Sequence, residues 1–263
     1  MTALPEIAGW NLLSVVILML CVWPFSLVRR DAGIVDIFWG LGFVLVAWLT
    51  FLHADGYLGR RLLVTLLTTV WGFRLALHLA WRSGGEGEDR RYRKMRAAHG
   101  KNFWWVSLFT VFGLQAVLLW LVSLVIQAPQ AADAPARLTW LDGVGVLVWA
   151  FGTGFEALAD WQLAAFKADP ANRGAVMRRG LWAWSRHPNY FGEMLVWWGL
   201  YLVALTSPRN AWTIISPLTM TFLLLKVSGV SLMEKDIADT RPGYPEYVRA
   251  TNAFWPWFPK RHG

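Results

Sequence analysis

A basic, aromatic-rich loop that leads into an apolar helix carries the clearest candidates for chemistry in this sequence. Arg178, Arg179, Arg186 and His187 precede Pro188, after which the sequence is largely apolar. Proline suits the first turn of a helix because it lacks only an N–H that would have no partner there. The pattern therefore predicts a helix that begins at Pro188. Helix N-termini attract anions, so this basic segment is a candidate anion site.

Glu193 lies one turn into the predicted helix, within an otherwise apolar run. A carboxylate inside hydrocarbon costs roughly 2 to 4 kcal/mol unless it is paired or used. We therefore interpret Glu193 as a site residue.

Five further ionisable side chains fall inside long apolar runs and are expected at the same depth as Glu193. Charged groups in a membrane usually face one another or a wet cavity. Six such groups from five helices therefore predict one polar chamber that opens to the cytosol, where nucleotide cofactors are found. Each residue alone could instead snorkel, or pair to pin two helices together. The five are Asp36, Arg74, Glu156, Asp160 and Lys226.

Glu156 and Asp160 are four residues apart, on one face of a predicted helix, with Lys167 following. Two carboxylates at this spacing can bind a metal, act as acid and base, or accept hydrogen bonds from ribose and amide groups. Metal binding would need further oxygen or imidazole ligands. Since no predicted helix carries a histidine pair, we expect no metal site.

The stretch Gly152-Thr-Gly154-Phe-Glu-Ala157 has the letters of a dinucleotide-binding fingerprint but not its context. That motif works as a turn between a strand and a helix, whereas this stretch lies inside a continuous apolar helix. We expect its small residues, like Gly143 and Gly145, to allow close packing of helices.

The loop between Arg82 and Arg96 is the densest run of charge in the chain. It is either a solvated cytoplasmic loop or, at its glycine-rich start beside Arg82, a place where backbone approaches a phosphate.

The five histidines are scattered and the single cysteine, Cys21, lies in an apolar run. The sequence therefore offers no arrangement typical of a hydrolase and no intrachain disulfide.

Seven apolar runs of about 17 to 25 residues are long enough to span a membrane. The chain has 263 residues, of which 56% are hydrophobic and 19 are tryptophan, a composition typical of a bilayer protein. We expect an all-α, polytopic integral membrane protein that forms one domain over residues 1–263. The predicted spans are Trp10–Val28, Ile34–Leu52, Leu62–Trp81, Phe103–Ile126, Trp140–Phe166, Tyr190–Thr206 and Ala211–Val227.

The distribution of positive charge predicts an outside N-terminus and a cytoplasmic C-terminus. Glu6 precedes the first apolar run, whereas Arg29 and Arg30 follow it, an order that argues against a cleaved signal peptide. With alternating helices, nineteen of the 25 Lys and Arg residues fall on the cytoplasmic side and four outside, as the positive-inside rule expects.

The tail from Ser228 onward reads as a short polar helix, a turn rich in Pro and Gly, and an aromatic strip over residues 254–259. We expect it to lie at the cytoplasmic interface as an anchor, as a lid across the chamber, or as both.

The segment Gly180–Glu193, followed by Trp197-Trp198-Gly199, resembles the C-terminal signature of the steroid 5-alpha-reductase family in its bacterial membrane branch. The likeness runs from Gly152 to the C-terminus and is weaker through Trp71–Arg74. It implies seven transmembrane helices in a bacterial inner membrane and an NADPH pocket that faces the cytoplasm.

The resemblance also implies roles for individual residues. An acid on the second helix and a tyrosine on the third hydrogen-bond the substrate ketone in this family. Asp36 corresponds to the acid, and Trp71 stands at the tyrosine position. In the family an Asn stands where Glu156 stands here. The residues expected around NADPH are Arg74, Arg82, Glu156, Asp160, Lys167, Arg179, Arg186, His187, Asn189, Tyr190, Glu193 and Lys226.

The implied chemistry is reduction of the 4,5 double bond of a 3-oxo-4-ene steroid or a similar hydrophobic enone that enters from the bilayer. Asp36, protonated because of burial, would polarise the ketone oxygen. An alternative is an S-adenosylmethionine-dependent methyltransferase, because the core Arg186-His-Pro-x-Tyr190 also resembles isoprenylcysteine carboxyl methyltransferases. A third possibility, a membrane scaffold without enzymatic activity, leaves the convergent charges unexplained.

Overall fold

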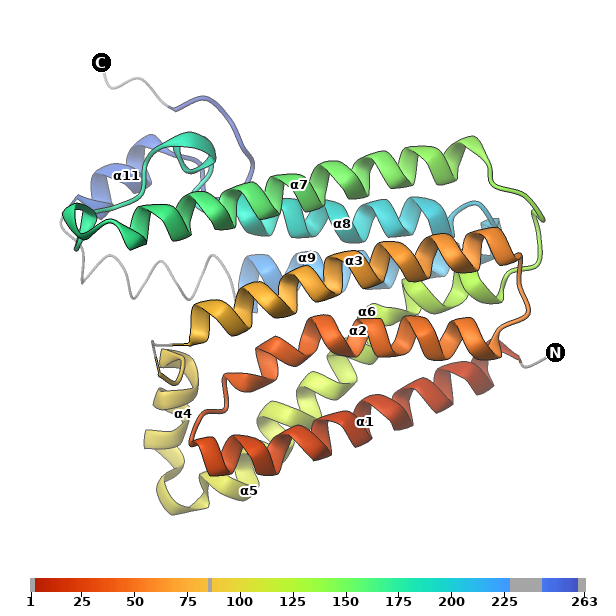
Figure 1. Ribbon diagram of the computed structural model, residues 1–263, viewed down its shortest axis with the longest axis horizontal. Coiled ribbons are helices and arrows are strands. Elements are labelled where there is room, and N and C mark those ends of the chain that lie inside the picture. The colour runs from red at the N-terminus through yellow and green to blue at the C-terminus, as the bar shows by residue number, and fades with distance from the viewer. Residues whose placement is uncertain (1–2, 85–86, 228–242, 260–263) are drawn as a thin grey trace. The chain divides into compact units, whose positions relative to one another are not determined.

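The computed structural model describes residues 3–84, 87–227 and 243–259. These residues form helices joined by short turns, and within them no strand is present. A single parallel bridge joins Ser185 to Asn252. The all-helical architecture is thus confirmed for the described part of the chain (Figure 1).

The helices fall into two compact units, which are described one at a time. The first unit comprises Met1–Thr139 and Ala204–Ser216, and the second comprises Trp140–Val203 and Pro217–Gly263. Whether the 263 residues act as one catalytic domain stays a prediction.

In the first unit, α2 and α3 pack through a close approach of two glycines. A Cβ added at Gly40 would lie 2.3 Å from the carbonyl oxygen of Gly72, so neither position can carry a side chain without separating the helices. The main elements are α1 (Leu4–Arg29), α2 (Ile34–His53), α3 (Leu58–Ser83), α4 (Arg90–His99), α5 (Phe103–Ser107), a π-helical turn (Leu108–Gly113) and α6 (Leu114–Ala131).

Buried amides and hydroxyls tie α1, α2 and α6 together. The Asn11 amide donates to the Thr50 hydroxyl over 2.8 Å and to the Gln127 amide oxygen over 2.9 Å. All three side chains are buried. Since polar groups in an apolar interior are costly when unpaired, these bonds fix how the three helices meet.

The second unit is built on α7 (Trp140–Ala168) and α8 (Pro188–Ala204), which also cross at glycines. An added Cβ at Gly145 would lie 2.7 Å from Gly199 O, and one at Gly152 would lie 2.7 Å from Gly192 O. The expected role of small residues is confirmed at Gly145 and Gly152. Gly143 and Gly154, by contrast, face open space. The unit also holds most of α9 (Ile215–Phe222), its π-helical continuation (Leu223–Val227) and α11 (Tyr244–Ala250).

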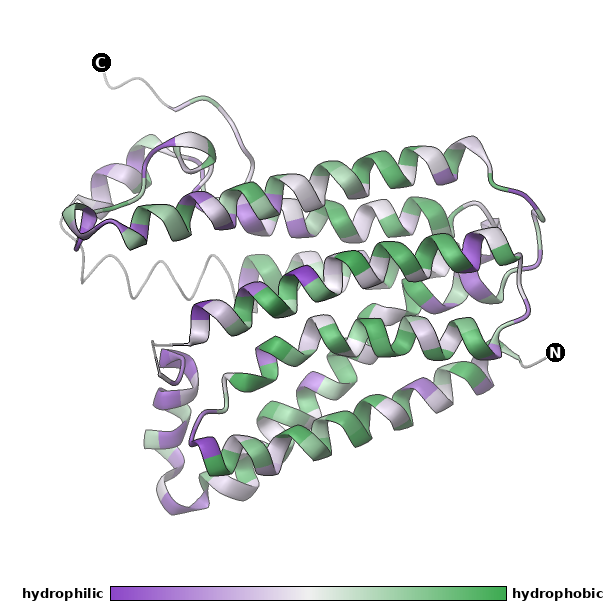
Figure 2. Ribbon diagram, viewed as in Figure 1, coloured by the Kyte–Doolittle hydropathy of each residue, from purple (hydrophilic) through white to green (hydrophobic). Residues whose placement is uncertain are grey.

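Among the described residues, five helical segments are long and apolar enough to cross a membrane: Leu4–Arg29, Ile34–His53, Leu58–Ser83, the continuous run Arg90–Ala131 from α4 to α6, and Trp140–Ala168. Hydrophobic residues cover most of their length, whereas hydrophilic residues gather on α4 (Figure 2). An integral membrane protein is therefore supported. The sixth and seventh predicted spans are helical as expected, but α8 has 17 residues and α9 has 8, so the count of seven and the orientation stay predictions.

Candidate functional site

Asp36 lies in the first turn of α2, and both of its carboxylate oxygens are engaged by α4. The Arg91 guanidinium donates to Oδ2 over 2.8 Å, and the Tyr92 hydroxyl donates to Oδ1 over 2.9 Å. The Tyr92 side chain is buried, with 5% of its surface exposed. An acid and a phenol are thus in direct contact in the first unit.

The residues before α4 hold this helix against the start of α2. Asp89 caps α4, since its Oδ1 accepts from the Arg91 backbone N–H over 2.8 Å, an arrangement that satisfies an otherwise unpaired helix donor. Glu88 accepts from the Ala32 N–H over 2.9 Å and from the Arg96 guanidinium over 2.7 Å and 2.9 Å. Glu88 therefore connects the α1–α2 turn to α4.

The pKa values of the Glu88 and Asp89 carboxyl groups both lie below their ordinary values. Burial opposes ionisation of Glu88, but hydrogen bonds from Arg96 and from the Ala32 N–H outweigh it and lower its pKa. For Asp89, burial is likewise outweighed by the hydrogen bond and charge of Arg91, and its pKa is also lowered. At neutral pH both carboxylates are therefore ionised, and charged hydrogen bonds hold α4 in place.

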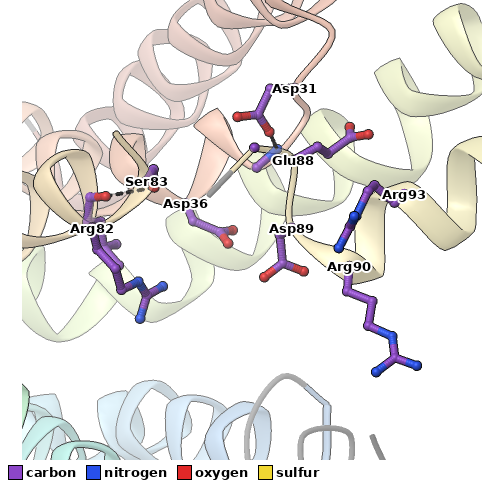
Figure 3. Close-up of a pocket in the computed structure, with 11 residues that line it drawn as sticks. Asp31, Asp36, Arg82, Ser83, Glu88, Asp89, Arg90 and Arg93 are labelled. Carbon is purple, nitrogen blue, oxygen red and sulfur yellow. Dashed lines mark hydrogen bonds between the residues drawn. The ribbon is translucent and has the colours of Figure 1, made fainter. Parts of the chain in front are cut away.

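A pocket of about 250 Å³ opens beside Asp36. Four carboxylates and three arginines line it, contributed by the α1–α2 turn, α2, the end of α3, and the turn before α4 with the start of that helix; Figure 3 shows how these side chains lie around the pocket. Arg82, expected to approach a phosphate, is among them. The charged lining residues are Asp31, Asp36, Glu88, Asp89, Arg82, Arg90 and Arg93.

Tyr92 is an aromatic donor in direct contact with Asp36, whereas the residue expected at this role was Trp71. Trp71 lies in α3 with 1% of its surface exposed, and its ring centroid is 6.0 Å from that of Phe43. Arg74, one turn further along α3, is half-buried. Sequence reasoning missed Tyr92 and Arg91 because both lie in the charged loop between Arg82 and Arg96, for which a solvated loop and a phosphate contact at its glycine-rich start are the two expectations. The available signal was Asp89, a helix-capping residue type placed just before them.

In the second unit, two expected cofactor residues meet between α7 and α8. The Asn189 amide donates to Asp160 Oδ1 over 3.1 Å, and Asp160 is 7% exposed. Glu156, one turn earlier on α7, is 2% exposed. Its Cβ lies 2.8 Å from where a Cβ of Gly192 would be, so the absence of a side chain at Gly192 makes room for it. Glu193 follows on α8, half-buried.

The loop before α8 is bonded to α7 and to the tail. Gln162 accepts from the Leu181 N–H over 2.9 Å, and the Trp182 indole donates to Ala159 O over 3.0 Å. The Tyr247 hydroxyl donates to Trp182 O over 2.5 Å. The backbone of Gly180 has a φ of +58°, a conformation that favours glycine.

Arg186 and His187 make specific contacts with other parts of the protein, which a loop that simply faced an anion would not require. The Arg186 guanidinium donates to Val248 O and Thr251 O, at the C-terminal end of α11. His187 is buried and its ring stacks parallel to that of Tyr190, with centroids 5.5 Å apart. Pro188 begins α8, as predicted.

The remaining expected cofactor residues are cations at exposed positions. Lys167 lies in the last turn of α7, Arg179 lies just before the short helix Gly180–Ala183, and Lys226 lies in the π-helical turn after α9. Asp36, Trp71, Arg74 and Arg82 belong to the first unit, and the others belong to the second. The single polar chamber therefore stays a prediction.

Among the described residues, no group of three or more His, Cys, Asp or Glu side chains is arranged to hold a metal ion. The polar residues before α11, including Glu234 and Asp236, lie outside the described residues. The aromatic strip is described, and Trp255, Trp257 and Phe258 are exposed.

Comparison with known proteins identifies relatives over most of the chain. The profile of a family described as "protein of unknown function (DUF1295)" matches residues 22–251. An uncharacterised protein of Schizosaccharomyces pombe is 27% identical over 265 residues, which cover 89% of this chain and 75% of that protein. No solved structure matches the chain.

Proposed function

The chain belongs to DUF1295, a steroid 5-alpha-reductase-like family, and on this basis we propose that it is a membrane-embedded, NADPH-dependent reductase of the 4,5 double bond of 3-oxo-4-ene steroids or similar enones. The observation that carries the proposal is the contact between the Asp36 carboxylate and the Tyr92 hydroxyl. An acid and a phenol at one point are suited to polarise a ketone oxygen.

On the substrate side, Tyr92 supplies a phenolic donor beside Asp36. Because Asp36 accepts from both Arg91 and Tyr92, it orients the phenol as long as it is ionised. A single O–H cannot donate to Asp36 and to a ketone at once, so the phenol polarises a ketone oxygen that binds beside it only when Asp36 is protonated and no longer accepts from it. A proton on Asp36 would give a second donor, as the family resemblance implies.

On the cofactor side, the donors and acceptors of the second unit fit a dinucleotide. The carboxylates of Asp160 and Glu156 can accept hydrogen bonds from ribose hydroxyls, Asn189 and Glu193 can hold amide or hydroxyl groups, and exposed cations can neutralise phosphates. When bound, NADPH supplies the hydride that reduces the beta carbon of the enone. The tasks of the protein are to orient the reactants, exclude water and polarise the ketone.

Ligand-induced thermal stabilisation of the purified protein in lipid nanodiscs tests this assignment first. A ligand that binds only the folded protein raises its melting temperature, and we expect this of NADPH. Stabilisation by S-adenosylmethionine but not by NADPH would overturn the proposal in favour of a methyltransferase.

Turnover provides the second test. NADPH oxidation should depend on a 3-oxo-4-ene steroid and yield a product saturated at the 4,5 bond. Tyr92→Phe should lower turnover on the order of a hundredfold, as the loss of a donor at a developing oxyanion does, while Tyr57→Phe, in the turn before α3, serves as the matched control. An alcohol product would make the protein a carbonyl reductase instead.

A further inference from the structure

Two buried hydrogen-bond donors on α7 have no acceptor within the described part of the chain. They are the indole Nε1 of Trp149 and the hydroxyl of Thr153. Trp149 is 8% exposed, and the Thr153 oxygen is itself buried. A buried donor without a partner costs about 1 to 3 kcal/mol, and folded proteins rarely keep two of them so close together unless a ligand or water uses them.

These two donors lie on the same face of α7 as two of its acids. Trp149, Thr153, Glu156 and Asp160 follow one another at intervals of four, three and four residues. In a helix of 3.6 residues per turn these intervals place all four side chains on one face. The backbone positions of this α7 polar stripe, from Asp160 to Trp149, extend about 16 Å along the helix axis.

The two ends of the stripe differ in chemistry. At one end, Asp160 and Glu156 are carboxylates, which accept hydrogen bonds from hydroxyl groups. At the other end, an indole N–H and a hydroxyl donate, and therefore suit a carbonyl oxygen. The nicotinamide nucleoside of a dinucleotide presents both kinds of group, with ribose hydroxyls and, beyond them, the carboxamide oxygen of the nicotinamide ring.

We propose that Trp149 and Thr153 bind the carboxamide oxygen of the nicotinamide ring of NADPH, and so hold that ring at the inner end of the α7 polar stripe. This inference rests on the proposed reductase function and extends it, because it assigns residues that position the part of the cofactor that reacts. It also explains why both donors lack an acceptor among the residues that the structure describes.

The test compares Thr153→Val with wild type, because valine has nearly the shape of threonine but no hydroxyl. Removing an unsatisfied buried hydroxyl should leave the melting temperature of the ligand-free protein unchanged or raised. The affinity for NADP⁺ should nevertheless fall roughly threefold to tenfold, the value of one hydrogen bond. Affinity for 2′-phospho-ADP-ribose, which lacks the nicotinamide ring, should stay at the wild-type value. Trp149→Phe should show the same selective loss.

Thr221→Val is the matched control, since the Thr221 hydroxyl accepts from the Trp198 indole and donates to Pro217 O. It should lower the melting temperature without distinguishing the two ligands. Wild-type affinity of Thr153→Val for NADP⁺ would overturn the inference and assign the donors to bound water. An equal loss for both ligands would overturn it as well, and so would weakened enone binding with unchanged NADP⁺ affinity. If wild-type protein bound neither NADP⁺ nor NADPH, the reductase function itself would fail.

Discussion

Replacing Gly152 by alanine should separate α7 from α8 and weaken the site that they share. The added Cβ would lie 2.7 Å from Gly192 O, 2.8 Å from Val196 N and 2.9 Å from Leu195 Cβ. Two of these atoms belong to the backbone and cannot rotate away, so the helices must move apart. Overpacking of this kind costs about 1 to 3 kcal/mol.

Gly154 provides a control two residues along the same helix. A Cβ added there meets no atom within 4 Å, and alanine is preferred over glycine in helices by about 0.5 to 1 kcal/mol. Gly154→Ala should therefore be as stable as wild type or more stable. Because the same gain in helix preference applies at Gly152, the two variants should differ by the overpacking cost alone, about 1 to 3 kcal/mol in the free energy of unfolding.

The assay is thermal or denaturant unfolding of both variants in the same nanodiscs, followed by NADP⁺ binding. Separation of the helices would also stretch the 3.1 Å contact between Asn189 and Asp160, so Gly152→Ala should bind NADP⁺ more weakly than Gly154→Ala. Equal stability and equal affinity of the two variants would refute the reasoning from the helix crossing.

Three further predictions concern the chemistry, the acid sensitivity and the topology. Asp36→Leu should abolish most turnover and Asp36→Asn part of it, with NADPH affinity nearly unchanged in both; wild-type turnover by Asp36→Leu would remove the role assigned to this acid. Because the pKa of Glu88 is lower in the folded protein than its ordinary value, its ionised form stabilises the fold at neutral pH, and this contribution is lost as the pH falls below about 4.3. Unfolding measured from pH 7 to pH 3 should show a smaller acid loss for Glu88→Gln than for wild type, and equal slopes would contradict the assignment. A reporter inserted near Ala132 should read as external and one fused after Gly263 as cytoplasmic; the opposite readings would reverse the orientation and the chamber.

Hydropathy and helix-start chemistry predicted the helices because both act locally along the chain. Each predicted span coincides with a helical segment, and Pro188 begins α8 as its chemistry requires. Spacing on one helix likewise brought Glu156 and Asp160 to one face. The close crossings at Gly145 and Gly152 followed from residue size alone.

Contacts between distant segments could not be predicted in the same way. Tyr92 reaches Asp36 across 56 positions of sequence, and Arg186 reaches Val248 across 62. Periodicity contains no information on such pairings, and the high charge around Tyr92 favoured a solvated loop. The unpaired donors at Trp149 and Thr153 were likewise hidden, because both residue types are common in apolar helices.

The bonds between the loop before α8 and the tail set an order of assembly. Ser185, Arg186 and Trp182 receive their partners from residues 247–254, which are synthesised about sixty residues later than the loop, and chains generally fold from the N-terminus as they are made. The segment that leads into α8 therefore has to wait, inserted but incompletely bonded, until residues 247–254 have left the ribosome. A chain that stops short of them would lose the bonds that hold the loop before α8, so the proposed binding of a nucleotide would require that synthesis has reached the tail.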